Sequence, residues 1–134
     1  MPDGVVQAPD LDALLAASDA VSLHLLLADG TRGLLSRERL ARMKPGAILV
    51  NTARGGLVDE AALVDALRTG RLGHAALDVF ETEPLPTGHA LTMLPNATLS
   101  AHSAFRTAEA NENLLAAAFD HLARIATEAA SASR

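Results

Sequence analysis

Residues 46–80 read GAILVNTARGGLVDEAALVDALRTGRLGHAALDVF, and this stretch decides the fold. It opens with an apolar run at residues 46–51 and closes with a second run at residues 73–80. Both runs have strand length and are typical of a parallel sheet that is buried on both faces. Between them Asp59 caps a helix that we expect to end at Gly70, a residue that favours the left-handed backbone of a helix end. The stretch therefore predicts a strand–helix–strand unit with parallel strands.

The same alternation continues on both sides of this unit. Two further strands are expected, at residues 20–27 and 97–100. Three further helices are expected, at residues 11–17, 36–43 and 107–127. Ser36 and Thr107 are the expected N-caps of the second and third of these helices. The pattern predicts an α/β fold of partial Rossmann type, that is, half of a doubly wound parallel sheet with flanking helices, in one domain over residues 1–134.

Composition limits the partners and the chemistry. About half of the residues are apolar but only 2% are aromatic, so we expect a buried core that is aliphatic. A formal charge of -5 argues against nucleic acid or an anionic membrane as a partner. The absence of cysteine excludes disulfides, thiolate metal ligands and a cysteine nucleophile. The apolar runs are too short to cross a membrane and residues 1–9 do not resemble a secretory signal, so we expect a cytoplasmic protein.

Reactive side chains follow three of the expected strands. Arg54 lies just after the second strand, and His102 lies just after the fourth. Asp78 and Glu83 lie at and after the end of the third strand. Because ligands bind beyond the carboxyl ends of the strands in an open parallel sheet, we expect these side chains to converge on one edge.

This combination of residue types suits one class of reaction. Arginine can hold a carboxylate with two parallel hydrogen bonds, and histidine can exchange a proton with a hydroxyl or a carbonyl near neutral pH. A carboxylate beside the histidine orients the ring and favours its charged form. With a nicotinamide cofactor as the hydride carrier, such a site interconverts 2-hydroxy acids and 2-keto acids.

Other interpretations of the same residues remain open at this point. Taken singly, Arg54 and Glu83 fit solvated surface charges, and His102 fits a structural or exposed histidine. A metal-dependent hydrolase built on Asp78, Glu83 and His102 is a further alternative, although the spacing is not typical of a metal site and we expect no metal.

Several motifs of the chain point to one protein family. They are VNTARGGLVDE at residues 50–60, LDVFETEPLP at 77–86 and LPNATLSAH at 94–102. In this order they resemble the arginine motif, the aspartate and glutamate motif, and the histidine-bearing segment of the D-isomer-specific 2-hydroxyacid dehydrogenases. SLH at 22–24 and TRGL at 31–34 also match, so the resemblance extends over nearly the whole chain.

The resemblance implies roles for individual residues. Arg54 would bind the carboxylate and carbonyl of a small 2-keto or 2-hydroxy acid, and His102 would be the general acid and base. Glu83, rather than Glu81, would pair with that histidine. Asp78 would hold the carboxamide side of the nicotinamide. The other residues implied to line the NAD or NADP site, together with Arg54 and His102, are Leu25, Leu26, Thr31, Thr52 and Ala53.

The resemblance also implies parts of the family that these 134 residues do not contain. No G-x-G-x-x-G loop is present, and no segment corresponds to a substrate-binding domain. We therefore expect the chain alone to bind NAD(P)H weakly or not at all, and the expected strand at residues 20–27 to pair with a second copy through its open edge. The alternative function is a non-catalytic remnant or interaction module. The sequence does not decide which acid is used, or NAD against NADP.

Overall fold

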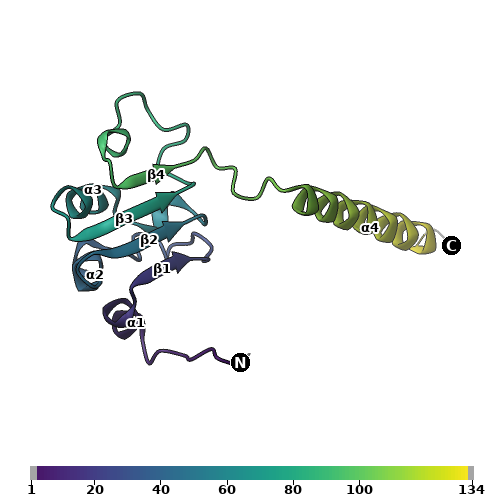
Figure 1. The fold of residues 1–134 in the computed structure, drawn as a ribbon. Helices are drawn as coiled ribbons and strands as arrows, with labels where there is room; N and C mark the ends of the chain where they lie inside the picture. Colours follow the sequence, from purple (N-terminus) through teal and green to yellow (C-terminus); the bar gives the residue numbers. More distant parts are fainter. Residues whose placement is uncertain (1–2, 133–134) are drawn as a thin grey trace. The chain divides into compact units, whose positions relative to one another are not determined.

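The computed structural model describes residues 3–132 and divides the chain into two units, Met1–His102 and Ser103–Arg134. The first unit is built on a four-stranded parallel sheet whose spatial order follows the chain order (Figure 1). The strands are β1 (Ala20–Leu23), β2 (Ala47–Asn51), β3 (Leu72–Leu77) and β4 (Ala97–Leu99). The α-helices of this unit are α1 (Leu11–Ala17), α2 (Arg37–Arg42) and α3 (Glu60–Arg68), and two short 3-10 helices are η1 (Gly55–Leu57) and η2 (Ala90–Met93). The predicted α/β class and partial Rossmann topology are confirmed.

The helix ends follow local chemistry that could be predicted from the sequence. The Asp59 carboxylate accepts the Ala62 N–H at 2.9 Å, and the Ser36 hydroxyl accepts the Arg39 N–H at a longer 3.4 Å. Each side chain satisfies a backbone donor that the first turn of a helix leaves unpaired. Gly70 follows α3 with a φ of 70°, as expected at a helix C-terminus.

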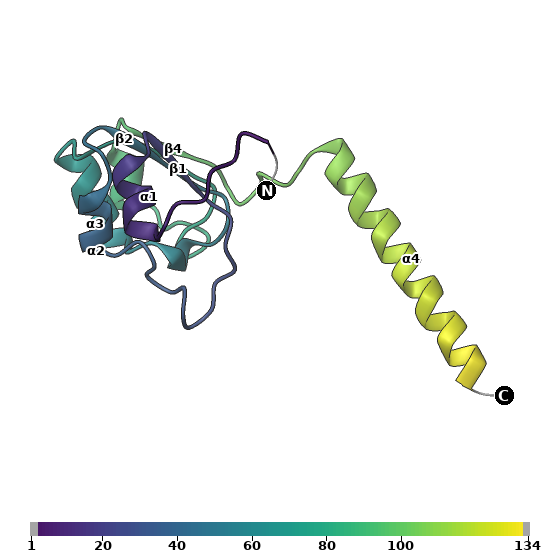
Figure 2. The ribbon, with the colours of Figure 1, turned by 90° about the horizontal axis from the view of Figure 1, so that it is seen from below.

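The three helices lie together against one face of the sheet, because α1 contacts α2 and α2 contacts α3 (Figure 2). Burial alternates along β2: Ala47, Leu49 and Asn51 are buried, whereas Ile48 is 42% exposed. The expectation of strands buried on both faces is therefore wrong for the described residues. A continuous apolar run cannot show whether both of its faces find partners, because period-two alternation is hidden when every residue is apolar.

Three strands end earlier than predicted. β1 pairs with β2 only as far as Leu23, opposite Asn51, and the chain turns away from the sheet after that point. Residues 24–27 then lack a ladder partner, and the Thr31 hydroxyl donates to the Leu26 carbonyl at 2.7 Å instead. In the same way β3 ends at Leu77, and β4 ends one residue early at Leu99. Shorter strands leave longer loops at the edge where ligands bind in this type of fold.

The second unit contains helix α4 (Ala108–Ala132). The Thr107 hydroxyl accepts the Ala110 N–H at 3.1 Å, as predicted for its N-cap. The helix continues past the predicted end near Thr127, because alanine, the best helix former, dominates residues 126–132. Although α4 has 25 residues, neither it nor any other described helix has the apolar length that a membrane crossing needs.

Candidate active site

A buried asparagine fixes the turn that carries Arg54. Asn51 ends β2 and is only 1% exposed. Its Nδ2 donates to the Arg54 carbonyl at 2.9 Å, and its Oδ1 accepts the Ala53 N–H at 3.0 Å. The Arg54 side chain itself is at the surface, where one guanidinium nitrogen donates to the Ala53 carbonyl at 2.6 Å. The turn is thus rigid in its backbone while its guanidinium stays accessible to a ligand.

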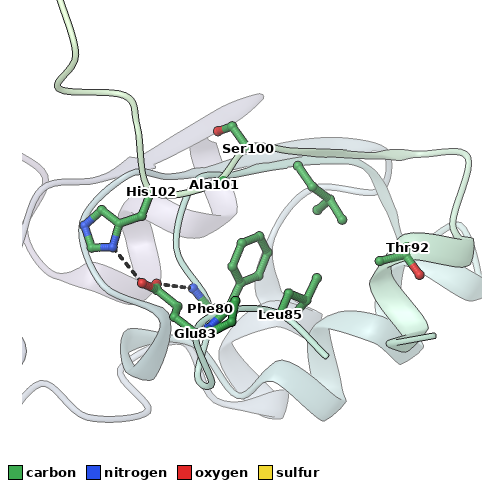
Figure 3. A pocket seen from close by; sticks show the side chains of 9 residues that line it. Phe80, Glu83, Leu85, Thr92, Ser100, Ala101 and His102 are labelled. Atoms are coloured by element: carbon green, nitrogen blue, oxygen red, sulfur yellow. Dashed lines mark hydrogen bonds and ion pairs between the residues drawn. The ribbon is translucent and has the colours of Figure 1, made fainter. Parts of the chain in front are cut away.

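Glu83 and His102 form a hydrogen-bonded pair. His102 Nδ1 lies 2.7 Å from Glu83 Oε2, and the Phe80 N–H donates to Glu83 Oε1 at 2.9 Å (Figure 3). Both bonds lower the pKa of the Glu83 carboxyl, and the bond with His102 has the larger effect. Partial burial of the carboxyl acts in the opposite direction but is weaker. The carboxyl is therefore ionised near neutral pH, and its Oε2 accepts a hydrogen bond from the Nδ1–H of His102. This arrangement leaves Nε2 of His102 as the ring atom that can exchange a proton with a ligand.

The backbone of His102 is held in an unusual conformation. Its φ of 49° lies in the left-handed region, which is uncommon for a residue other than glycine. The His102 N–H donates to the Asp78 carbonyl at 2.8 Å, which ties the segment after β4 to the end of β3. Residues held in this region cost about 1–3 kcal/mol and are concentrated at functional sites.

The three predicted catalytic side chains line one hollow. Its volume is about 250 Å³. Its lining comprises Leu27, Arg32, Arg54, Gly55, Gly56, Phe80, Glu81, Glu83 and His102. The prediction that the strand ends deliver an arginine, a glutamate and a histidine to one edge is thus realised in the structure. A larger, mainly apolar hollow of about 670 Å³ shares Phe80, Glu83 and His102 with the first (Figure 3).

Comparison with known proteins agrees with this arrangement. Residues 2–104 match the family model described as "D-isomer specific 2-hydroxyacid dehydrogenase, NAD binding domain". The chain belongs to this family. The glyoxylate reductase of Thermofilum pendens is 51% identical to it over 105 residues, covering 78% of this chain and 31% of that protein. The (S)-sulfolactate dehydrogenase of Chromohalobacter salexigens is 48% identical over 120 residues, covering 90% of this chain and 39% of that protein.

A solved structure supports the same assignment. The D-isomer specific 2-hydroxyacid dehydrogenase of Xanthobacter autotrophicus, in complex with NADPH and MES, superposes with a TM-score of 0.67 and 49% identity. The match covers 69% of this chain and 30% of that one. The chain thus spans about a third of the length of the dehydrogenases that it matches.

Several residues predicted to line the cofactor are not in the lining of the two hollows, unlike Arg54 and His102. Leu25 and Leu26 follow β1 and are 44% and 82% exposed. Thr52 and Ala53 form the start of the arginine turn.

Two polar residues predicted at the cofactor are engaged with the protein itself. Asp78 is 3% exposed, and its carboxylate accepts a hydrogen bond from the Ser100 hydroxyl. The Thr31 hydroxyl accepts the Ala28 N–H at 2.8 Å as well as donating to Leu26. Asp78 thus links the ends of β3 and β4, and Thr31 stabilises the loop after β1.

Metal ligation has no geometric support in the described part of the chain. Among residues 3–132, no three histidine, aspartate or glutamate side chains are grouped so that they could hold a metal ion. Asp78, Glu83 and His102 are therefore not arranged as the metal-dependent hydrolase alternative requires.

Sequence reasoning missed the residues that support the site. Asn51 carried a visible signal, since a polar residue that ends an apolar strand needs buried partners. Gly55 carried none: a Cβ there would lie 2.0 Å from the Phe80 carbonyl carbon, and only the tertiary structure brings the two together. Arg32 pairs with Glu81 at 3.3 Å across 49 positions of sequence, which spacing could not reveal.

Proposed function

We propose that this chain supplies the catalytic half of the nicotinamide site of an oxidoreductase that interconverts 2-keto and D-2-hydroxy acids. The observation that carries the proposal is the 2.7 Å bond between His102 and Glu83, in a hollow that Arg54 also lines. Family membership supports the reaction class. In this proposal residues 1–134 form part of an NAD(P)-binding domain.

Arg54 is the carboxylate-binding residue of the proposed site. A guanidinium presents two parallel N–H groups that match the two oxygens of a carboxylate. Because the Asn51 side chain fixes the backbone on either side, the guanidinium is anchored at its base. It would orient the substrate so that the C2 carbonyl faces His102, and alignment of this kind lowers the barrier.

His102 is the proposed acid and base. In reduction, bound NAD(P)H supplies the hydride that reaches C2, and Nε2 of His102 gives a proton to the carbonyl oxygen. In oxidation the hydroxyl proton returns to the same nitrogen. Glu83 stabilises the ring in the orientation that points Nε2 away from the carboxylate, and it offsets the positive charge of the imidazolium.

The cofactor would lie across the carboxyl ends of β1 and β2. Leu25, Leu26, Thr52 and Ala53 would contact it, with Thr31 bracing the first loop. Asp78 would need to turn one carboxylate oxygen toward the carboxamide of the nicotinamide. The choice between NAD and NADP stays open in this proposal, and a cytoplasmic location stays a prediction from the sequence.

A graft tests the proposal. Residues 2–104 would replace the matching segment of the Thermofilum pendens glyoxylate reductase, which is 51% identical. We expect the graft to oxidise NADH or NADPH when glyoxylate is added. The control variant Arg37→Gln of the same graft should retain this activity, because Arg37 lies away from the site and its pair with Asp65 is exposed. A graft that folds and binds cofactor but reduces no 2-keto acid would overturn the proposal.

We further propose that the open edge of β1 pairs with a second copy of the chain. β1 lies at one end of the sheet, and β2 is its only strand partner among the described residues. Unpaired N–H and C=O groups along a strand edge favour such pairing. Sedimentation should show a dimer or larger assembly, and a monomer at high concentration would refute this proposal.

A further inference from the structure

The loop of residues 81–89 carries Glu83, the partner of His102. It leaves the sheet after β3 and ends at His89, which caps η2. Glu83 is the third residue of this loop, two positions after its held beginning, so its distance to His102 depends on how the loop is held.

One carboxylate contacts both ends of the loop. Glu60 is the first residue of α3, and about a quarter of its side chain is exposed. Its Oε2 accepts the Glu81 N–H at 3.4 Å, where the loop begins. Its Oε1 lies 3.1 Å from Nε2 of His89, where the loop ends. The two oxygens thus join residues that are eight positions apart.

The His89 ring is oriented for this contact by a second bond. Its Nδ1 accepts the Leu91 N–H at 3.3 Å, and Leu91 is 1% exposed. A ring nitrogen that accepts cannot carry the proton, so in neutral His89 the proton is on Nε2 and points to Glu60. In this tautomer the Nε2–H of His89 donates to Glu60 Oε1.

We propose that Glu60 and His89 are positioning residues that close the loop and hold Glu83 within hydrogen-bonding distance of His102. This inference rests on the proposed function, because it assumes that the Glu83–His102 pair acts in catalysis. Closing a loop at its base removes conformations in which the glutamate would lie away from the ring. The polar contacts of Glu60 are with Glu81 and His89, not with the pair, so its effect is transmitted through the loop.

The test uses the full chain and two readouts from NMR. The first readout is hydrogen exchange of the Phe80 amide, which donates to Glu83, measured against the Leu49 amide in the central strand. The second is the pKa of the Glu83 carboxyl, which also feels Asp78 directly and shares its hollow with Arg32, Arg54 and Glu81. The variants are Glu60→Ala, Glu60→Gln and, as a control on the same helix, Asp65→Asn, which breaks the remote pair with Arg37.

Glu60→Ala should speed exchange at Phe80 by about tenfold relative to Leu49, as expected when a hydrogen bond to a carboxylate is weakened. It should also raise the pKa of Glu83 toward its ordinary value. Glu60→Gln retains one acceptor oxygen and should fall between Glu60→Ala and the unchanged chain. Asp65→Asn should move neither readout.

The inference would be overturned if Glu60→Ala accelerated amide exchange equally at Phe80 and Leu49. It would also be overturned if neither Glu60 variant changed the exchange at Phe80 or the pKa of Glu83. His102→Gln separates this failure from failure of the proposed function. If that variant raises the pKa of Glu83 and the Glu60 variants do not, only the positioning role is wrong. If His102→Gln leaves the pKa unchanged, the acid–base pair itself is wrong.

Discussion

Replacing Gly55 with alanine should displace backbone that belongs to the site. A Cβ at this position would lie 2.0 Å from the Phe80 carbonyl carbon, 2.1 Å from its oxygen and 2.5 Å from the Glu81 nitrogen. All three atoms are backbone, so no rotamer change relieves the overlap. Ordinary van der Waals contact begins at 3.4 Å, whereas this Cβ would lie 2.0 Å from the Phe80 carbonyl carbon. The backbone must therefore move by about 1.4 Å to relieve the overlap.

This displacement has two measurable consequences. Overpacking of a rigid neighbour costs about 1–3 kcal/mol, and we expect the upper end because backbone must move. At roughly 4–8 °C per kcal/mol for a domain of this size, Tm should fall by more than about 10 °C. If the shift reaches Glu83 in full, its 2.7 Å bond to His102 lengthens beyond hydrogen-bonding distance, and the pKa of the carboxyl rises.

Thermal and urea unfolding followed by circular dichroism measure the loss of stability, and NMR titration of Glu83 measures the change in its pKa. Gly30→Ala is the matched control, because a Cβ there meets nothing within 4 Å. We expect the control to stay within about 0.5 kcal/mol of the unchanged chain. A Gly55→Ala chain as stable as this control, with an unchanged Glu83 titration, would refute the reasoning.

Three further predictions follow from the same geometry. The pKa of Glu83 is lowered in the folded state, so the ionised carboxylate stabilises the fold above its unfolded pKa of about 4.3. This stabilisation is lost as the pH falls through the folded pKa. Urea unfolding at a series of pH values should therefore show that the free energy of unfolding depends less on acid pH in Glu83→Gln than in the unchanged chain. Asp59→Ala should lower the free energy of unfolding by about 1 kcal/mol and by more than Ser36→Ala, since the cap bonds are 2.9 Å and 3.4 Å; equal losses would contradict this ranking. The 134-residue chain should bind NADH only weakly, because it contains no glycine-rich loop to hold the pyrophosphate; fluorescence titration giving a micromolar Kd would contradict this.

The sequence predicted the parts of the fold that depend on local chemistry. Caps such as Asp59 and Thr107 and the glycine after α3 are encoded within a few residues of where they act. Strand ends were predicted too late because pairing with a neighbour decides where a parallel strand stops, as at Leu23. The uncovered face of β2 was missed for a similar reason, since an apolar residue such as Ile48 is compatible with either environment.

The candidate site shows the same division. Arg54, Glu83 and His102 could be selected because each follows a strand and because the motifs around them resemble one family. The supports of these residues were not predictable, since Gly55 meets Phe80, and Glu60 meets His89, only after the chain has folded. The motif residues indicate the class of reaction, whereas the contacts that hold them in place depend on long-range packing.

The rate of hydride transfer in a single turnover of the graft tests the central claim most directly. With His102→Gln the rate should fall by about 10²- to 10⁴-fold, the usual contribution of a general acid, while binding of the keto acid is retained. Arg54→Gln should instead weaken binding of the keto acid by about 10- to 100-fold, because charge-assisted hydrogen bonds to its carboxylate are lost. If both variants transfer hydride and bind the acid as the unaltered graft does, the convergence of these side chains is not the basis of a dehydrogenase site.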